Sequence, residues 1–184
     1  MNKQRFRVKY YAEGKYLYVF KIFGSNRLLK ITQQEFYHKC DHVNAKRAEQ
    51  SCLLMNQLAV AKLAPKCQYL GGSALIVDNA GPQITLEKIK TRDCIITFFS
   101  LLKNWSLKHG IVILDLNENN WCCNDEQLLF VDIDCEKTCR LQEIRSNPVV
   151  KKRIDVKAYS DDIEAFAAFL NKEEQLLWNY LKQG

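Results

Sequence analysis

The sequence predicts an α+β fold in which a β-rich first half is followed by a mostly helical second half. Short apolar stretches separated by glycine-containing turns fill most of residues 5–31 and 66–81, a pattern typical of antiparallel strands. Apolar residues recur with a helical period in residues 44–65, 92–109 and 160–182. The 184 residues, 47% of them apolar, are enough for one compact domain with a sizeable core.

The first half is expected to form a sheet of about five strands covered by one helix. Three strands are predicted in "RFRVKYY", "YLYVFKIF" and "RLLKI", with turns at 12–15 and 24–26, and two more in "KCQYLGG" and "SALIVDNAG". The helix is expected to begin at an Asn44 cap and to end at Pro65. These elements predict a small antiparallel sheet with one main helix packed on it.

The second half is expected to be built from two long helices with a hairpin between them. The helix over 92–109 places five large apolar residues on one face, and Gly110 stands where a left-handed stop is expected. Those residues are Ile95, Phe98, Phe99, Leu102 and Trp105. "NWCC" and "LLFVDI" flank the polar turn "NDEQ" and predict the hairpin, and Ser160 is the expected cap of the last helix.

Composition narrows the classes of protein that the chain can belong to. No window holds the 18 or more apolar residues that a membrane-spanning helix needs, and "MNKQRFRVKYY" has no apolar stretch behind its charges, so we expect no transmembrane segment and a cytoplasmic protein. The eight cysteines are therefore expected to be free thiols. The net charge of +6 favours an anionic partner, but no motif that interleaves aromatic and basic residues predicts binding to nucleic acid.

Three oxygen-bearing side chains are expected to converge at strand ends in the second half. Asp115 and Asn120 lie in the loop "DLNENN", and Asp132 ends the second strand of the predicted hairpin. Mg²⁺ prefers hard oxygen ligands and is commonly held by one or two carboxylates together with substrate phosphates, which suits Asn120 and Asp132. A further carboxylate, Asp115, is free to accept the proton of an attacking hydroxyl. The pattern predicts phosphoryl transfer.

Two structural alternatives compete with this interpretation. The polar residues of the loop can simply satisfy its own backbone, although Asp132 at the right downstream distance disfavours that. Four cysteines, Cys122, Cys123, Cys135 and Cys139, can be interpreted as a zinc site, but adjacent residues of a strand point to opposite faces.

"HGIVILDLNENN" followed by "LLFVDID" resembles the catalytic loop and metal-binding motif of the protein-kinase-like superfamily, H-x-D-x-x-x-x-N and then D-F-G. The resemblance implies a bilobal fold, with an N-lobe over about 1–82 and a reduced helical C-lobe over about 83–184. It implies ATP and Mg²⁺ as cofactors, Asp115 as the catalytic base, and Asn120 and Asp132 as metal ligands.

The same resemblance nominates residues that would orient the nucleotide. "EQSCLLMNQLAVAKLAP" is similar to helix C of the superfamily and nominates Glu49, whose lysine partner is either Lys21 or Lys30. Lys30 has the separation from Glu49 usual in protein kinases, whereas Lys21 has the better strand context and resembles the lysine of bacterial lipopolysaccharide-core heptose kinases, which favours it slightly. "ALIVDNAG", with Asp78 and Ala80, is the expected strand and hinge beside adenine.

The chain also departs from the superfamily pattern. The His and Arg of H-R-D are replaced by Ile113 and Leu114, the lysine two residues after the base by Asn117, and D-F-G by "DID". Only Gly14 stands in for a glycine-rich loop, and residues 137–184 match no pattern. D-x-D and D-L-N variants occur among kinases of small molecules and lipopolysaccharide and among minimal bacterial effector kinases. The departures therefore favour these branches of the superfamily and do not exclude the superfamily itself.

Three functions follow from the resemblance. The first is a kinase of a lipopolysaccharide-core sugar, peripheral at the inner membrane. The second is a minimal Ser/Thr protein kinase of the secreted effector type, which acts on a protein hydroxyl and is exported. The third is a pseudokinase or binding module, favoured by the missing glycine-rich loop. The sequence does not fix the acceptor.

Overall fold

The computed structural model describes residues 7–13, 17–32, 41–89, 91–124, 127–148 and 150–183. The chain divides into two compact units, the first made of Met1–Ala59 and Pro65–Asn79 and the second of Val60–Ala64 and Ala80–Gly184. The sequence placed the boundary a few residues later, at 82 and 83. Gly14 and most of the turn expected at 12–15 lie outside the described residues.

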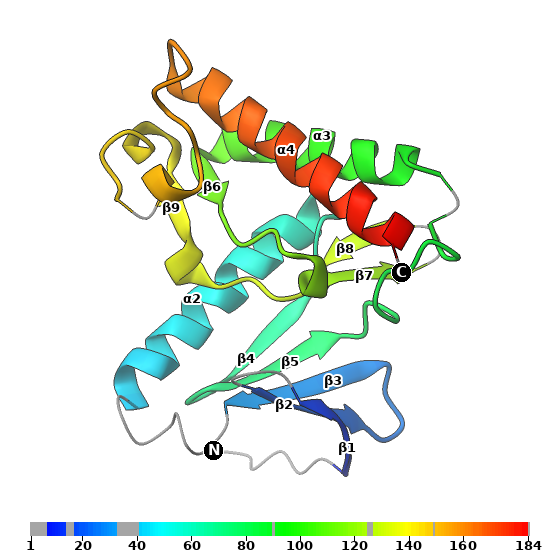
Figure 1. The fold of residues 1–184 in the computed structure, drawn as a ribbon. Helices are drawn as coiled ribbons and strands as arrows, with labels where there is room; N and C mark the ends of the chain where they lie inside the picture. The colour runs from blue at the N-terminus through cyan, green and yellow to red at the C-terminus, as the bar shows by residue number, and fades with distance from the viewer. Residues whose placement is uncertain are drawn as a thin grey trace. The chain divides into compact units, whose positions relative to one another are not determined.

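The first unit contains the predicted five-stranded sheet (Figure 1). Its order is β1-β2-β3-β5-β4, and each neighbouring pair is antiparallel. The strands are β1 (Val8–Glu13), β2 (Leu17–Ile22), β3 (Arg27–Thr32), β4 (Cys67–Gly71) and β5 (Ala74–Asp78). The turn between β2 and β3 contains Gly24 with φ of 71°, a left-handed conformation that glycine adopts without strain.

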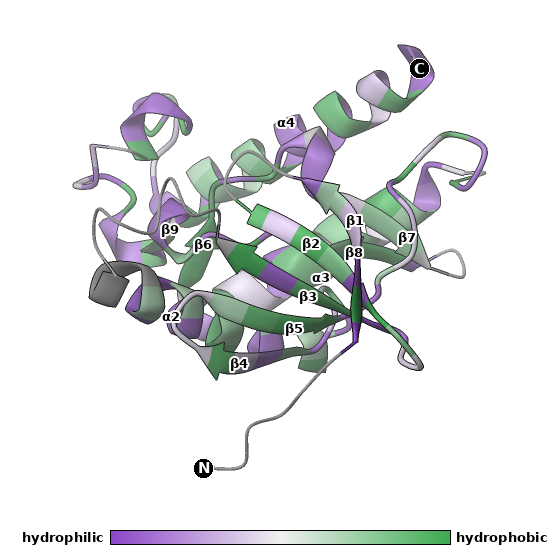
Figure 2. Cartoon of the chain, turned by 90° about the horizontal axis from the view of Figure 1, so that it is seen from below, coloured by the Kyte–Doolittle hydropathy of each residue, from purple (hydrophilic) through white to green (hydrophobic). Residues whose placement is uncertain are grey.

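The register sorts the strand residues onto two faces. Leu29 lies opposite Phe20 on one side and Ile76 on the other, and Leu29 and Ile76 are buried together with Ile22. The other face carries the Cys67 thiol, which hydrogen-bonds with Cys52 of helix α2 (Asp41–Val60). Asn56 of the same helix donates to the Cys67 carbonyl at 2.7 Å and accepts from its N–H at 2.8 Å. Figure 2 shows β5, beside β4, coloured mostly as hydrophobic. One face therefore forms a small core, and the other holds α2.

Helix α2 differs from the predicted helix at both ends. It begins at Asp41, so Asn44 lies inside the helix and the prediction that Asn44 caps it is wrong. It ends at Val60, ahead of Pro65, and Lys62 takes a left-handed φ of 60° in the following turn. A cap was expected at Asn44 because asparagine favours that position, but the helical backbone extends one turn further.

The second unit is built around two packed helices (Figure 1). Helix α3 (Asp93–His109) buries the predicted face, and Gly110 ends it with a φ of 66° and an N–H that donates to the Ser106 carbonyl, as predicted. Helix α4 (Asp162–Gln183) packs against α3. Its cap is Asp161, whose Oδ1 accepts the N–H groups of Ile163 and Glu164 at 2.8 Å, so the prediction of a Ser160 cap is wrong by one residue.

The predicted hairpin is present and has an aromatic core. Strands β7 (Trp121–Asn124) and β8 (Gln127–Phe130) are antiparallel, and Trp121 is fully buried. Its ring centroid lies 4.9 Å from that of Phe98 and 5.0 Å from that of Phe130. These contacts fix the hairpin against α3 and thereby fix the residues that precede Trp121.

A second strand pair was not expected from the sequence. Strand β6 (Ile111–Ile113), directly after α3, is antiparallel to β9 (Thr138–Arg140). Four short 3₁₀ turns accompany these strands: η1 (Glu118–Asn120), η2 (Cys135–Lys137), η3 (Leu141–Glu143) and η4 (Val150–Lys152). None of the helices described is both long and apolar enough to cross a bilayer.

Candidate active site

The β6–β9 pair places Asp115 beside residues that lie far along the chain. After β6 ends, the N–H of Leu114 donates to the Lys137 carbonyl at 2.9 Å, so the backbone pairing continues one residue beyond the strands. Asp115 follows at once and is 7% exposed. A buried carboxylate needs partners, because losing water around a charge is costly unless the charge is paired.

Two cations and one amide surround the Asp115 carboxylate. Lys137 Nζ lies 2.6 Å from Oδ2, Arg153 Nη2 lies 3.8 Å from Oδ1, and Asn117 Nδ2 donates to Oδ1 at 3.2 Å. The Asp115 side chain is 11% exposed, whereas those of Lys137 and Arg153 are 45% and 43% exposed. The two cations therefore reach a nearly buried carboxylate from the solvent side.

Arg153 is also tied to the loop backbone. Its Nη1 donates to the Leu114 carbonyl at 2.6 Å. The turn η4 precedes it, and the flanking side chains of Val150 and Ile154 are buried. The guanidinium thus bridges a backbone oxygen and the neighbouring carboxylate, a use for which its fork of donors is suited.

Asn120 lies next to Asp115, as predicted. The turn η1 positions it, with Asn117 Oδ1 accepting the N–H of Asn119 at 3.1 Å. Asn120 is 6% exposed, and its Nδ2 donates to the Asp115 carbonyl at 3.3 Å. Within the described residues no donor approaches its Oδ1, so that oxygen is available as a ligand.

Asp132 is adjacent to this loop but differs from Asp115 in exposure. The N–H of the preceding residue, Val131, donates to the Asn120 carbonyl at 2.9 Å. Asp132 itself is exposed and makes no hydrogen bond or ion pair with any described residue. The structure therefore places Asp132 one residue beyond the backbone contact with Asn120, with both carboxylate oxygens unengaged.

Asp134, the third residue of "DID", has a structural role in the turn that follows it. Asp134 Oδ1 accepts the N–H of Glu136 at 3.0 Å and caps η2. The N–H of Lys137 donates to the Asp134 carbonyl at 3.0 Å. Asp134 therefore shapes the turn that delivers Lys137 to Asp115.

The donor set fits a magnesium ion that shares its ligands with phosphates. No group of three or more His, Cys, Asp or Glu side chains in the described ranges is arranged to hold a metal. One unengaged amide oxygen, on Asn120, and one exposed carboxylate, on Asp132, remain, and both are hard oxygen donors. Mg²⁺ is commonly bound by such a small protein set plus substrate phosphates.

The nominated residues of the first unit are less tightly held. Lys21, in β2, is exposed, and its Nζ lies 4.3 Å from the centroid of the Tyr11 ring. Glu49, in α2, is exposed and makes no ion pair within the part of the chain that the structure describes. The predicted pairing of Glu49 with a lysine stays a prediction.

Lys30 lies in β3 and is half-buried. Lys30 pairs in register with Leu75 of β5, and Val77, two residues further along β5, lies on the same face. Cys67 of β4 pairs with Val77 and therefore also lies on that face. Burial raises the pKa of the Cys67 thiol well above its usual range, and the Lys30 charge opposes that shift. Lys30 therefore faces the side of the sheet that α2 covers.

The two expected adenine neighbours lie at the end of β5 and just beyond it. Asp78 is half-buried as the last residue of β5, in the first unit, and Ala80 is buried in the second unit. Their role beside adenine stays a prediction.

Sequence reasoning missed Lys137 and Arg153. Both follow "DID" in a region that matches no motif, and no spacing rule connects them to Asp115. A partial signal exists, because "VVKKRIDVK" concentrates basic residues between apolar ones, of which Val150, Ile154 and Val156 are buried.

The fold is protein-kinase-like, as the sequence predicted: a five-stranded antiparallel sheet with one main helix, and a second unit of helices with short strand pairs that holds Asp115, Asn120 and Asp132. No known sequence family matches the chain, and no curated protein matches it in sequence.

Among solved structures, the chain is similar to the Rio2 kinase from Chaetomium thermophilum, which was solved as a complex with ADP, Mg²⁺ and phosphoaspartate. The TM-score is 0.59 and the sequence identity 12%, over 96% of this chain and 54% of that one. The chain thus spans about half the length of that kinase, and the likeness establishes the fold alone.

Proposed function

We propose that the protein is an ATP-dependent phosphotransferase that transfers the γ-phosphate of ATP to a hydroxyl group. The observation that carries this proposal is the buried Asp115 carboxylate, held by two cations and adjacent to Asn120, in a protein-kinase-like fold. A carboxylate at this point of the fold is well suited to accept the proton of an acceptor hydroxyl.

In the proposed reaction the acceptor oxygen attacks the γ-phosphorus while its proton moves to Asp115. A new P–O bond forms, the bond between the γ-phosphorus and its bridging oxygen breaks, and ADP leaves. Lys137 and Asn117 keep the carboxylate oriented, one on each oxygen. Lys137, half-exposed beside Oδ2, is also suited to balance charge on the transferred phosphoryl group, because preorganised donors stabilise such charge.

Asn120 and Asp132 are the residues that would hold Mg²⁺. When bound, the ion neutralises charge on the phosphates and fixes their orientation. The contribution of this chain is to present one amide oxygen and one carboxylate from neighbouring backbone positions, joined by the Val131-to-Asn120 hydrogen bond.

Lys30 is the better candidate for the lysine that orients the α- and β-phosphates. It is half-buried on the sheet face that α2 covers, whereas Lys21 is exposed and lies over Tyr11. Glu49 is the proposed partner of this lysine when the nucleotide is bound. Asp78 and Ala80 are proposed to lie beside adenine.

The acceptor proposed first is a sugar hydroxyl of a lipopolysaccharide core, phosphorylated by an enzyme peripheral at the inner membrane. A protein hydroxyl, phosphorylated by an exported effector kinase, is the alternative. Both rest on the variant motifs "DLNENN" and "DID".

A nucleotide-binding module without turnover is the second candidate function. The observation that favours it is that both oxygens of Asp115 already have partners, Lys137 on Oδ2 and Asn117 on Oδ1. If both partners stay in place, neither oxygen is open to an acceptor hydroxyl.

The deciding experiment measures magnesium-dependent ATP turnover and nucleotide binding for wild type, Asp115→Asn and a control, Glu87→Gln, at an exposed position of the second unit. We expect turnover to fall about 10²- to 10⁴-fold in Asp115→Asn with nucleotide binding retained, and no change in the control. Binding without turnover in wild type would support the binding module. Absence of nucleotide binding in wild type would refute both candidates.

A further inference from the structure

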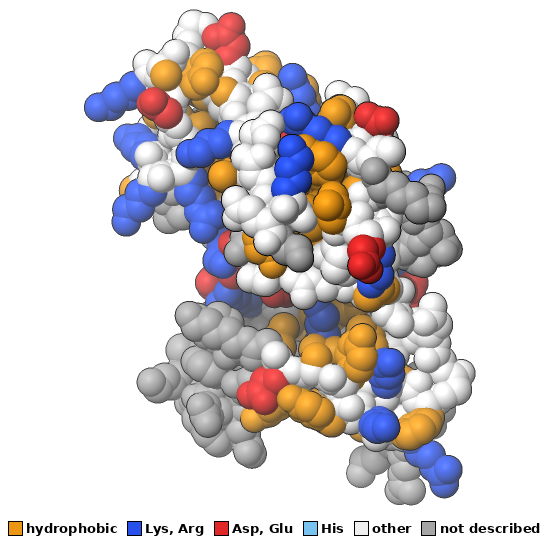
Figure 3. Space-filling view, turned by 45° about the vertical axis from the view of Figure 1, so that its right-hand side comes forward, with side chains coloured by type: hydrophobic (Ala, Val, Ile, Leu, Met, Phe, Trp, Pro, Cys, Tyr) orange, Lys and Arg blue, Asp and Glu red, His pale blue; other side chains and the backbone are white. Residues whose placement is uncertain are grey.

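Residues 137–157, here named the basic segment, carry most of the charge imbalance of the protein. The segment holds seven basic and two acidic residues, a net charge of +5, whereas the whole chain has a net charge of +6. Figure 3 shows Lys and Arg side chains gathered at the upper left of the second unit, where this part of the chain lies in Figure 1. The excess positive charge is therefore local.

The cations of the basic segment fall into two groups. Three of them, Lys137, Arg145 and Arg153, are used in ion pairs inside the second unit. The other four are exposed and make no ion pair with any described residue: Arg140, Lys151, Lys152 and Lys157. Unpaired cations close in sequence repel one another, and a bound anion relieves that repulsion.

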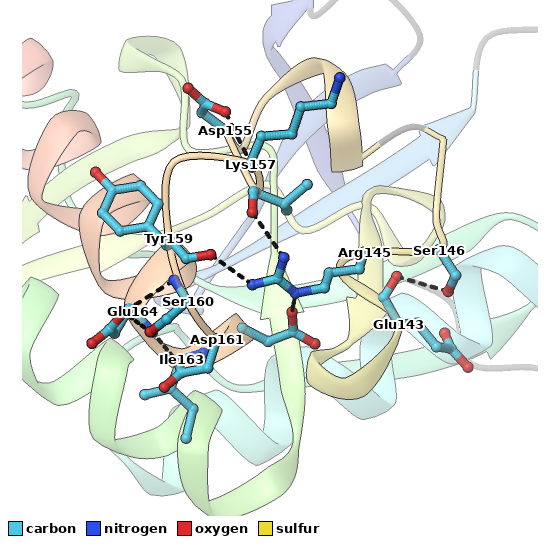
Figure 4. A network of polar contacts seen from close by, with 12 residues as sticks. Glu143, Arg145, Ser146, Asp155, Lys157, Tyr159, Ser160, Asp161, Ile163 and Glu164 are labelled. Atoms are coloured by element: carbon cyan, nitrogen blue, oxygen red, sulfur yellow. Dashed lines mark hydrogen bonds and ion pairs between the residues drawn. The ribbon is translucent and has the colours of Figure 1, made fainter.

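The later part of the basic segment is anchored to the fold. Arg145 donates to the carbonyls of Val156 and Tyr159 at 2.9 and 3.0 Å and pairs with Asp162 at 2.7 Å (Figure 4). Figure 4 also shows the Lys157 ammonium directed away from this network. The backbone on either side of Lys157 is thus held in place.

The free lysines are connected to the catalytic aspartate through one turn. Lys151 and Lys152 belong to η4, and the next residue, Arg153, contacts both the Leu114 carbonyl and the Asp115 carboxylate. A ligand whose hydroxyl lies at Asp115 therefore lies close to the turn that carries these lysines.

We propose that Lys151 and Lys152 of η4 form an acceptor-binding subsite that recognises phosphate or carboxylate groups on the sugar whose hydroxyl is phosphorylated. This inference rests on the proposed function, since it assumes a phosphoryl acceptor at Asp115. Lysines bind phosphate and carboxylate as point charges, and two of them on one short turn suit a compact anion. An acidic peptide, a ligand that basic clusters also bind, is the alternative that the test below separates from the sugar.

The test compares Lys151→Glu/Lys152→Glu with a matched control, Lys88→Glu/Lys172→Glu, which makes the same charge change at two exposed lysines outside the basic segment. The probe is deacylated lipopolysaccharide, with its phosphate groups and after their removal, titrated by calorimetry at 50 and 200 mM salt. We expect the phosphorylated probe to bind wild type and the control within about twofold of each other, and the paired variant at least tenfold more weakly. Binding to wild type should weaken with salt and with loss of the phosphates.

ATP hydrolysis without acceptor and nucleotide binding are measured in parallel, because the lysines of η4 have no role in either. If wild type binds the probe in the expected way but neither binds nor hydrolyses ATP, the proposed function fails, and η4 keeps its anion-binding site but loses the role of an acceptor subsite. If hydrolysis is intact and the paired variant binds the probe like wild type, the subsite is refuted. Phosphorylation of an acidic peptide that depends on Lys151 and Lys152, with no binding of the sugar probe, would also refute it.

Discussion

The two regions that supply the kinase-like residues differ in how firmly those residues are held. In the second unit, Asp115 is 7% exposed and its carboxylate has three neighbours with hydrogen-bonding or ionic groups. In the first unit, Lys21 and Glu49 are exposed, and neither makes an ion pair within the described residues.

The cause of this difference is burial. Removing one partner from a buried carboxylate leaves charge without compensation, so the contacts around Asp115 are required by its position. An exposed lysine or glutamate keeps its water and gains little from a surface ion pair. The chain therefore fixes Asp115, the proposed proton acceptor, in advance, whereas we expect the proposed nucleotide-orienting pair to form when phosphate charge is present.

The largest expected effect comes from the second unit, where contacts hold Asp115 in place. Lys137→Met removes the cation on Asp115 Oδ2, and we expect turnover to fall about 10²- to 10³-fold, as when one charge-stabilising donor is lost. Steady-state kinetics should show the loss in kcat with the KM for ATP little changed, and Lys137→Arg should recover part of it. An equal loss in Lys88→Met, an exposed lysine of the same unit, would contradict this role.

A smaller effect is expected in the first unit. Lys30→Met should weaken ATP binding about tenfold or more, because a hydrogen bond to a charged group contributes roughly 1.5–3 kcal/mol. Lys21→Met is the matched control on the neighbouring strand and should bind ATP like wild type. Titration of both variants with ATP decides between them, and the reverse ranking would restore Lys21 as the phosphate-orienting lysine.

The Glu49 pairing is tested by its energetic coupling to Lys30. A double-mutant cycle of Glu49→Gln and Lys30→Met is measured by ATP affinity. We expect a coupling energy of about 0.5–2 kcal/mol with nucleotide present, since residues that share an interaction are not additive. If the losses of ATP affinity in the two single variants add up in the double variant, Glu49 is not part of the nucleotide-orienting pair. The control is Gln50→Ala, which measures how a substitution in α2 next to Glu49 affects ATP affinity by itself.

The smallest expected effect concerns pH and stability near β9. Burial, followed by the Glu143 charge, raises the pKa of the Cys139 thiol to about 11. Because the pKa of this thiol is higher in the folded protein than in the unfolded chain, the protonated thiol contributes to the free energy of unfolding. This contribution is complete below about pH 9 and is lost as the pH rises toward 11. The free energy of unfolding, measured by chemical unfolding, should fall between pH 8 and pH 10 in both proteins. We expect this fall to be about 1 kcal/mol smaller in Cys139→Ala than in wild type. An identical loss in both proteins would contradict the assignment.

Local patterns predicted most of the elements. The five strands and the apolar face of α3 follow from residues within one turn or one strand of each other, as does the Gly110 stop. The errors were at helix ends, where Asn44 and Ser160 were chosen although the helices begin at other residues. Helix ends depend on which of several adjacent polar residues reaches the first free N–H groups, and this choice is not fixed by residue type.

The sequence by itself determined the Asp115, Asn120 and Asp132 pattern, because all three lie in one loop and the hairpin that follows it. Only the tertiary structure decided what holds Asp115. Lys137 lies 22 positions and Arg153 nearly 40 positions further along the chain, and both are brought there by the pairing of β6 with β9 and by the burial of Val150 and Ile154. Contacts at that separation depend on how the elements pack together, which a local pattern of residues does not encode.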